Sequence, residues 1–211
     1  MSVTDIYKIF AGEVASIDFA CGPGCATCCT RSVSLTTGEG RLVLDYLREQ
    51  GRDLPPLPFD AQPLHPGLTT NALAAIYLAG REPEEGNESP WLFEPCFFLR
   101  KGFCTIYEVR PFACRSFGST VACNKTGEAL APDWFVTLTI VINQILEELD
   151  RGGSWGNLAD ILTFLAGQAT SDYHASGRLL INQPVPGFLV VPEERERLAL
   201  ILEKIGWLGR G

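Results

Sequence analysis

The stretch Cys21-Gly-Pro-Gly-Cys25-Ala-Thr-Cys28-Cys29 places four cysteines within nine residues. A metal held by thiolates needs several sulfur atoms around one point, and two cysteines separated by two residues supply a pair from one tight turn. The segment between Cys21 and Cys25 has turn-forming composition, which lets flanking backbone N–H groups point at the sulfurs. Inert buried thiols explain isolated cysteines but not this density, which predicts an irregular, metal-binding core.

Within this stretch, Cys28 and Cys29 are adjacent. Neighbouring side chains diverge in most backbone conformations, so both would bind one mononuclear ion only with strain. We therefore expect one of the two to serve a second metal, an iron of a cluster, or no metal. The eight cysteines allow one site or two, and the sequence leaves that number open.

A second block carries Cys96, Cys104 and Cys114, separated by seven and nine residues, and Cys123 follows after eight more. These spacings are not those of a zinc knuckle. The role of Cys123 is left open, because the sequence around it gives no further indication of a ligand.

The second block is basic within an acidic chain. Residues 96–115 carry four basic side chains and one acidic side chain, a local charge of +3, whereas 17 basic and 25 acidic residues give the whole chain −8. Four thiolates around Zn²⁺ sum to −2 and cysteinyl iron–sulfur clusters are commonly anionic, so nearby guanidinium groups would stabilise either centre. Arg110 and Arg115 bracket Cys114, and we interpret them as cofactor-binding charge partners. Arg100 and Lys101 fit a solvated basic face equally well.

The composition of the chain narrows the function classes further. Two histidines and one methionine among 211 residues exclude chemistry built on histidine clusters or histidine-dependent triads, and the charge of −8 disfavours a nucleic-acid partner. The longest apolar run, residues 134–146, is too short to span a bilayer, and the N-terminus lacks a signal-peptide pattern. We expect a soluble, cytoplasmic protein without a membrane partner, whose thiols stay reduced.

The remaining sequence predicts a mainly α fold in which amphipathic helices wrap the cysteine-rich core, with few or no strands. Residues 1–211 are expected to form one domain, with a motif region over 18–123 and a helical extension over 131–211. Thr4 is the expected cap of the first helix, and Thr36 to Glu39 has capping-box spacing. The expected helices are 4–17, 36–50, 71–79, 132–150, 157–165 and 192–205. The short strand candidates are 31–35 and 188–191, and the expected surface loops are 55–66 and 82–95.

Together the two blocks carry a resemblance. The crowded first block followed by Cys96-Phe-Phe-Leu and by Cys104-Thr-Ile-Tyr-Glu-Val-Arg-Pro-Phe-Ala-Cys114-Arg-Ser-Phe resembles the CxxCxxCC (YkgJ-type) cysteine-cluster family over residues 18–123. The chain departs from the family pattern in having three residues between Cys21 and Cys25 and Phe97 in place of a proline. The resemblance implies a zinc- or iron-chelating domain. The expected metal ligands are Cys21, Cys25, Cys28, Cys29, Cys96, Cys104 and Cys114.

Three functions follow from these residues. The first is metal binding, for which we favour an iron–sulfur cluster over a zinc ion because only the first block has short spacing. The second follows from a similar motif in flagellin lysine N-methylases and is an S-adenosylmethionine-dependent protein methylase or another cluster-dependent modifying enzyme. The chain shows no glycine-rich loop after a predicted strand, and Thr27 stands where radical S-adenosylmethionine loops have an aromatic residue. The third is a zinc-stapled module that binds a protein partner. Substrate, partner and oligomeric state stay open.

Overall fold

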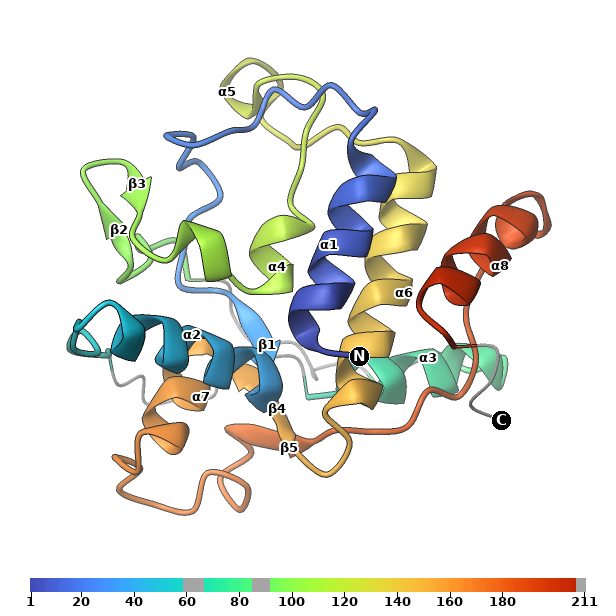
Figure 1. Cartoon of the computed structure of the whole chain (residues 1–211). Coiled ribbons are helices and arrows are strands. Elements are labelled where there is room, and N and C mark those ends of the chain that lie inside the picture. The colour runs from blue at the N-terminus through green and yellow to red at the C-terminus, as the bar shows by residue number, and fades with distance from the viewer. Residues whose placement is uncertain (59–66, 85–91, 208–211) are drawn as a thin grey trace.

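The computed structural model describes residues 1–58, 67–84 and 92–207 and is dominated by helices (Figure 1). Among these residues no helix is both long and apolar enough to cross a membrane. The α-helices are α1 (Val3–Val14), α2 (Thr37–Glu49), α3 (Thr70–Leu78), α4 (Phe112–Arg115), α5 (Cys123–Thr126), α6 (Asp133–Leu149), α7 (Leu158–Leu165) and α8 (Arg195–Lys204), with 3₁₀ turns η1 (Tyr107–Val109) and η2 (Pro192–Glu194). The strands are β1 (Ser34–Thr36), β2 (Leu99–Arg100), β3 (Phe103–Cys104), β4 (Ser154–Asn157) and β5 (Leu179–Ile181).

A small antiparallel sheet of order β1-β4-β5 joins distant parts of the chain. The central strand β4 comes from the C-terminal region and pairs with β1, which directly follows the first cysteine block. Gly156 of β4 opposes Leu35 and Leu179, and a Cβ atom at Gly156 would lie 2.6 Å from the Leu179 side chain. Region 131–211 therefore supplies two strands, β4 and β5, to a sheet that it shares with the motif region, in addition to helices.

Two apolar clusters flank the cysteine-bearing segments. The first joins α1, α6 and α8 around Phe112, and α1 and α6 lie side by side in Figure 1. The second joins β1, α2 and α7 with Phe98 and Ile106, and Cys96, Cys104 and Cys114 pack against it. Phe98 lies between Cys96 and Cys104 in the sequence, and Ile106 and Phe112 lie between Cys104 and Cys114. Because these three residues are buried in the apolar clusters, they fix the backbone that carries the thiols.

The helices agree with the sequence expectations most closely where a local cap fixes the start. The capping box of Thr36 and Glu39 opens α2, and Asn157 caps α7 as expected. The first helix begins at Val3, because Ser2, two residues before the expected cap Thr4, forms the cap with Asp5, and it ends at Val14 rather than at residue 17.

The predicted strands agree with the structure less closely than the predicted helices do. The candidate over 31–35 is a strand only from Ser34, and residues 188–191 form no strand. Phe188 and Val190 instead pack against the first apolar cluster, which explains their apolar character. Strands β2 to β5 were not predicted. The loops expected over 55–66 and 82–95 lie partly outside the described residues.

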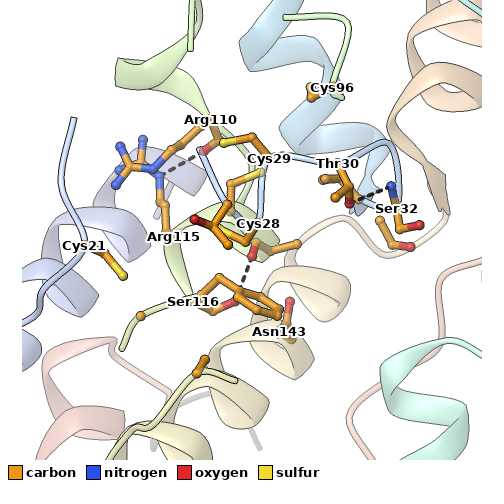
Figure 2. A pocket seen from close by; sticks show the side chains of 18 of the residues that line it. Cys21, Cys28, Cys29, Thr30, Ser32, Cys96, Arg110, Arg115, Ser116 and Asn143 are labelled. Carbon is orange, nitrogen blue, oxygen red and sulfur yellow. Dashed lines mark hydrogen bonds between the residues drawn. The ribbon is translucent and has the colours of Figure 1, made fainter. Parts of the chain in front are cut away.

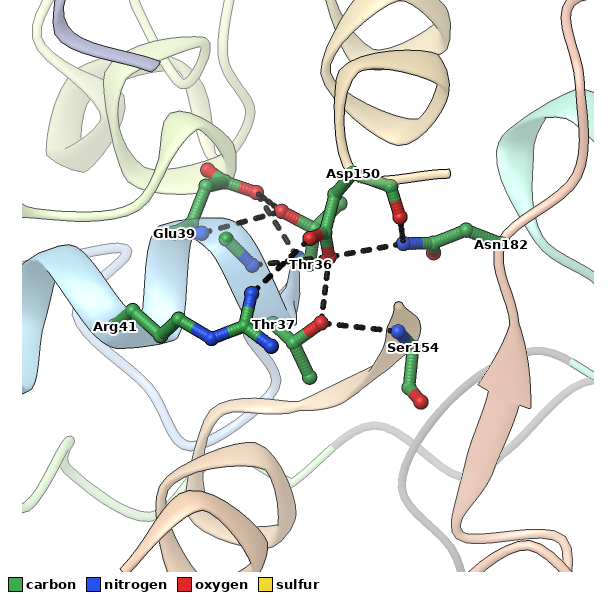
Figure 3. Close-up of polar contacts among 8 residues, drawn as sticks. Thr36, Thr37, Glu39, Arg41, Asp150, Ser154 and Asn182 are labelled. Atoms are coloured by element: carbon green, nitrogen blue, oxygen red, sulfur yellow. Dashed lines mark hydrogen bonds and ion pairs between the residues drawn. The ribbon is translucent and has the colours of Figure 1, made fainter. Parts of the chain in front are cut away.

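Asp150, at the end of α6, connects α2 and β5 through its carboxylate (Figure 3). Asp150 Oδ2 accepts hydrogen bonds from Thr37 Oγ1 (2.5 Å), the Gly38 N–H (2.9 Å) and Asn182 Nδ2 (3.0 Å). The half-exposed Arg41 guanidinium lies 3.3 Å from Asp150 Oδ1. We call this arrangement of Thr37, Gly38, Asp150 and Asn182 the Asp150 joint; it holds the ends of three elements together without any ligand.

Candidate metal centre

The first cysteine block forms two successive turns. The Cys25 N–H donates to the Gly22 carbonyl (2.9 Å), and the Cys29 N–H donates to the Ala26 carbonyl (3.0 Å). Gly24 has a φ of +93°, which a residue with a side chain rarely adopts, so the first turn needs glycine at this position. The two turns explain how four cysteines within nine residues reach one side of the loop without a helix or strand.

Backbone pairing ties this block to the second block. The Cys96 N–H donates to the Cys29 carbonyl (2.9 Å), and Thr30 and Pro95 form an isolated antiparallel bridge. Strands β2 and β3 then form a hairpin that brings Cys104 opposite Leu99. Its turn residues Lys101 and Gly102 have φ of 52° and 82°, the pattern typical of a two-residue hairpin turn.

Helix α4, which carries Cys114, is anchored by the buried carboxylate of Glu39. Glu39 Oε1 accepts hydrogen bonds from the Phe112 N–H (2.8 Å) and from the Tyr7 hydroxyl (2.7 Å). Its other oxygen, Oε2, accepts from the N–H of Thr36 (3.0 Å). One carboxylate that is 3% exposed therefore joins α1, α2 and α4. The sequence indicated Glu39 only as a helix cap, because its contact with α4 spans 73 residues.

The segment that leads to Cys123 lies beside the start of the first block. The Ala20 N–H donates to the Ser119 carbonyl (2.8 Å), and the Cys21 thiol lies 3.9 Å from the same oxygen. A Cβ atom at Gly118 would lie 2.7 Å from the Phe19 ring, so glycine permits this close approach. Cys123 then begins α5.

All these segments open onto one cavity of about 1350 Å³. Every cysteine of the chain lines it, including Cys123, whose role the sequence left open. We call it the cysteine cavity. Arg110 and Arg115 line it as well, and Figure 2 shows Cys28 and Cys29 together beside Arg110, with Cys21 apart from them beyond Arg115. The metal ligands predicted from the sequence are Cys21, Cys25, Cys28, Cys29, Cys96, Cys104 and Cys114, and all of them share this wall.

The thiols are free and their sulfur atoms do not converge on one ligation point. None of the eight cysteines forms a disulfide. Within residues 1–58, 67–84 and 92–207, no group of three or more His, Cys, Asp or Glu side chains has the arrangement of a metal site. The donor set is nevertheless of the right chemistry for zinc or an iron–sulfur cluster, and ligation would require the thiols to move toward one another.

The two guanidinium groups are held by carbonyl oxygens. Arg110 donates to the Tyr107 carbonyl (2.8 Å) and stacks over the Tyr107 ring at 3.7 Å from its centroid. Arg115 donates to the carbonyls of Arg110 (3.0 Å) and Glu108, and stacks over the Tyr7 ring at 4.2 Å. Across the described part of the chain, neither arginine pairs with a carboxylate. Two positive charges therefore stand at the cavity wall without a carboxylate partner among the residues that the structure describes.

Burial raises the pKa values of several thiols that line the cavity. It raises the pKa values of Cys96 and Cys104, and for Cys114 the neighbouring Cys96 and Cys104 raise the pKa further while Arg110 opposes the shift. The Cys28 thiol donates a hydrogen bond to Cys29, which raises the pKa of Cys28 and lowers the pKa of Cys29. A metal ion that binds these thiols would have to displace their protons.

The cavity extends beyond the cysteines. It is also lined by Leu73 and Tyr77 of α3, by Asn143 of α6, and by Thr30 and Ser32 after the first block. No local pattern distinguishes these residues from ordinary helix or loop positions, so the sequence did not indicate them.

Comparison of the chain with protein-family models, with curated proteins and with solved structures gave no match. The resemblance to the CxxCxxCC family therefore stays a prediction that rests on the motif residues themselves.

Proposed function

We propose that the chain is a metal-binding protein that holds an iron–sulfur cluster or a zinc ion through clustered cysteine thiolates. The observation that carries this proposal is that eight cysteines, separated by up to 102 residues, line one cavity and remain unpaired. Free thiols at this density are typical of metal centres in a reducing compartment, so the proposal includes a cytoplasmic location. The resemblance to the zinc- or iron-chelating family supports the same conclusion.

The charge of the cavity supports an anionic occupant. Arg110 and Arg115 are held at the wall by carbonyls rather than by carboxylates. A tetrathiolate zinc site has a charge of −2, and cysteinyl iron–sulfur clusters are also commonly anionic, so either centre would balance these guanidinium groups. A bound iron–sulfur cluster would supply electron transfer, whereas a bound zinc ion would cross-link the loops.

Anaerobic purification followed by metal analysis and a visible spectrum tests the proposal. A brown protein containing iron and sulfide would support the cluster that we favour, and a colourless protein with stoichiometric zinc would support the zinc-stapled module instead. A reduced chain that takes up neither iron nor zinc after reconstitution would overturn metal binding altogether.

Cys114→Ser gives the sharpest single-residue test of the ligands. Cys114 is held on α4 between the two apolar clusters, so serine should leave the fold intact while removing one thiolate. We expect lower bound metal and a lower thermal midpoint in the loaded protein, with little change when a chelator is present. Unchanged metal content and an unchanged midpoint would remove Cys114 from the ligand set. Ser116→Ala, two residues along and on the same cavity wall, is the matched control.

A modifying enzyme is the second candidate, and the size of the cavity favours it. A volume of about 1350 Å³ is larger than a metal ion or one cluster needs and lies above the range of most small-molecule pockets. The paired strands within the described residues are all antiparallel, so they offer no βαβ nucleotide site. Calorimetric titration with S-adenosylmethionine tests the methylase form of this candidate, because an absence of binding would exclude that donor.

A further inference from the structure

Backbone pairing and a shared apolar cluster bring four of the cysteines together on one part of the cavity wall. Cys29 and Cys96 are joined by the hydrogen bond from the Cys96 N–H to the Cys29 carbonyl (2.9 Å). Cys104 lies at the end of the hairpin that follows Cys96, and the Thr105 N–H closes this hairpin onto the Phe98 carbonyl (2.9 Å). Three of these thiols also pack against the same apolar cluster. We call this group the hairpin set: Cys29, Cys96, Cys104 and Cys114.

The other four cysteines lie on segments that are joined to each other by different contacts. Residues 19–21 and 118–119 are fastened by the hydrogen bond from Ala20 to Ser119 and by the close approach of Phe19 and Gly118. Ser119 is fully buried, and its hydroxyl contacts the Val121 carbonyl (2.6 Å) and accepts from the Leu130 N–H (2.9 Å), which fixes the approach to α5. We call this group the loop set: Cys21, Cys25, Cys28 and Cys123.

The boundary between the sets falls between two adjacent residues. The Cys29 carbonyl pairs with Cys96 and so belongs to the hairpin side, whereas the Cys28 carbonyl accepts from the Thr30 N–H (2.9 Å) within the loop itself. The Cys28 thiol donates a hydrogen bond to Cys29, so the two side chains lie together where the sets adjoin. Because two adjacent residues bind one ion only with strain, we assign one of this pair to each centre. Cys28 and Cys29 both line the cavity, which places a ligand for each centre at the point where the sets meet.

We infer that the cysteine cavity contains two tetrathiolate metal sites, one formed by the hairpin set and one by the loop set, with Cys123 as a ligand of the second. This inference rests on the proposed function and deepens it by fixing the number of sites and the members of each. Arg115 lines the same cavity, and its positive charge would lower the repulsion between two anionic centres.

Titration of the reduced chain with Co²⁺ alone tests the inference, because thiolate-to-cobalt absorption reports both the stoichiometry and the number of sulfur ligands. We expect two equivalents of tetrahedral, sulfur-ligated Co²⁺ in the unaltered chain, displaced by two equivalents of Zn²⁺. Cys123→Ser and Cys104→Ser should each lose one of the two equivalents. Cys25→Ser provides a second loop-set variant at an exposed thiol, where serine should not disturb folding.

Double variants separate the two sets. Cys25→Ser with Cys123→Ser falls within one set and should lose one equivalent in total, whereas Cys104→Ser with Cys123→Ser falls across the sets and should lose both. Circular dichroism and urea unfolding in a chelator establish that each variant is folded. Full retention of two equivalents by Cys123→Ser, or the same loss in both double variants, would overturn the division.

The failure of this inference can be told apart from the failure of the proposed function. One equivalent in the unaltered chain overturns two sites but leaves metal binding standing. Absence of Co²⁺ uptake also overturns the two sites, and the iron and zinc analysis described above then decides whether the chain binds metal at all.

Discussion

The Asp150 joint and the cysteine cavity differ in how their ionisable side chains are partnered. At the joint, Asp150 Oδ2 receives three hydrogen bonds from within the chain, and Arg41 faces the other oxygen. At the cavity, Arg110 and Arg115 donate to carbonyls and stack on rings, with no carboxylate partner in the described part of the chain, and the thiols form no disulfide. The joint thus pairs a carboxylate with a guanidinium group, whereas the cavity wall pairs two guanidinium groups with neutral carbonyls beside free thiols, which is the reason for placing an anionic ligand there.

The largest expected difference between the two regions is their response to pH. Burial raises the pKa values of Cys96, Cys104 and Cys114, so these thiols are protonated at neutral pH and a bound metal must displace their protons. Metal affinity should therefore rise with pH by about tenfold per unit for each thiol that is deprotonated on binding, and fall correspondingly in acid. Calorimetry in buffers of different ionisation enthalpy measures the protons released. An affinity independent of pH between 6 and 8 would contradict thiol ligation.

Removal of the joint carboxylate should give the largest loss of folding free energy. Asp150→Ala leaves the Gly38 N–H and the Thr37 hydroxyl without their acceptor, so we expect a loss of about 3 kcal/mol in urea unfolding. Asp150→Asn should cost less, about 1 kcal/mol, because its remaining oxygen can keep the Oδ2 contacts while its amide faces the half-exposed Arg41.

The control for the joint is Asp45→Ala, which removes an exposed ion pair with Arg48 and should change stability by less than about 0.5 kcal/mol. None of these three variants should alter the amount of metal bound per folded chain. If Asp150→Ala were as stable as Asp45→Ala, the joint would not hold the ends of α2, α6 and β5 together.

Glu39 directly follows Gly38 of the Asp150 joint and also accepts a hydrogen bond from α4, which carries Cys114. Glu39→Gln should therefore affect both regions. One carboxylate oxygen faces the Phe112 N–H and the other faces the Thr36 N–H, so neither orientation of a glutamine amide avoids placing its NH₂ group against a donor. We expect a loss of about 2 kcal/mol in unfolding and, because α4 carries Cys114, a fall in metal affinity of about tenfold. Chelator competition measures the affinity. Glu49→Gln, at the exposed end of α2, should change neither quantity.

These examples also show what sequence can and cannot predict for this chain. The caps at Thr36 and Asn157 were predictable because their partners lie two or three residues away. Strand β4 was not, since its four residues are too few to show alternation, and its glycine is explained by the Leu179 side chain and the Arg178 carbonyl across the sheet. The predicted cysteines do share one wall, but Cys123 reaches it through contacts between Ala20 and Ser119, which are 99 residues apart and leave no local pattern.

The smallest expected effect concerns the charge at the cavity wall. Arg110→Gln removes one positive charge near the thiols while keeping a side chain that can still donate to the Tyr107 carbonyl. Because Arg110 is only partly buried, solvent screens the interaction, and we expect a fall in metal affinity of about fivefold, equivalent to roughly 1 kcal/mol. The fall should shrink as ionic strength rises, which distinguishes a charge effect from a disturbed loop.

Arg48→Gln, whose partner is the exposed Asp45, is the matched control and should leave the affinity unchanged at every salt concentration. An equal, salt-independent loss in both variants would mean that Arg110 does not act through its charge, and the contrast between the cavity and the Asp150 joint would then rest on the thiols alone.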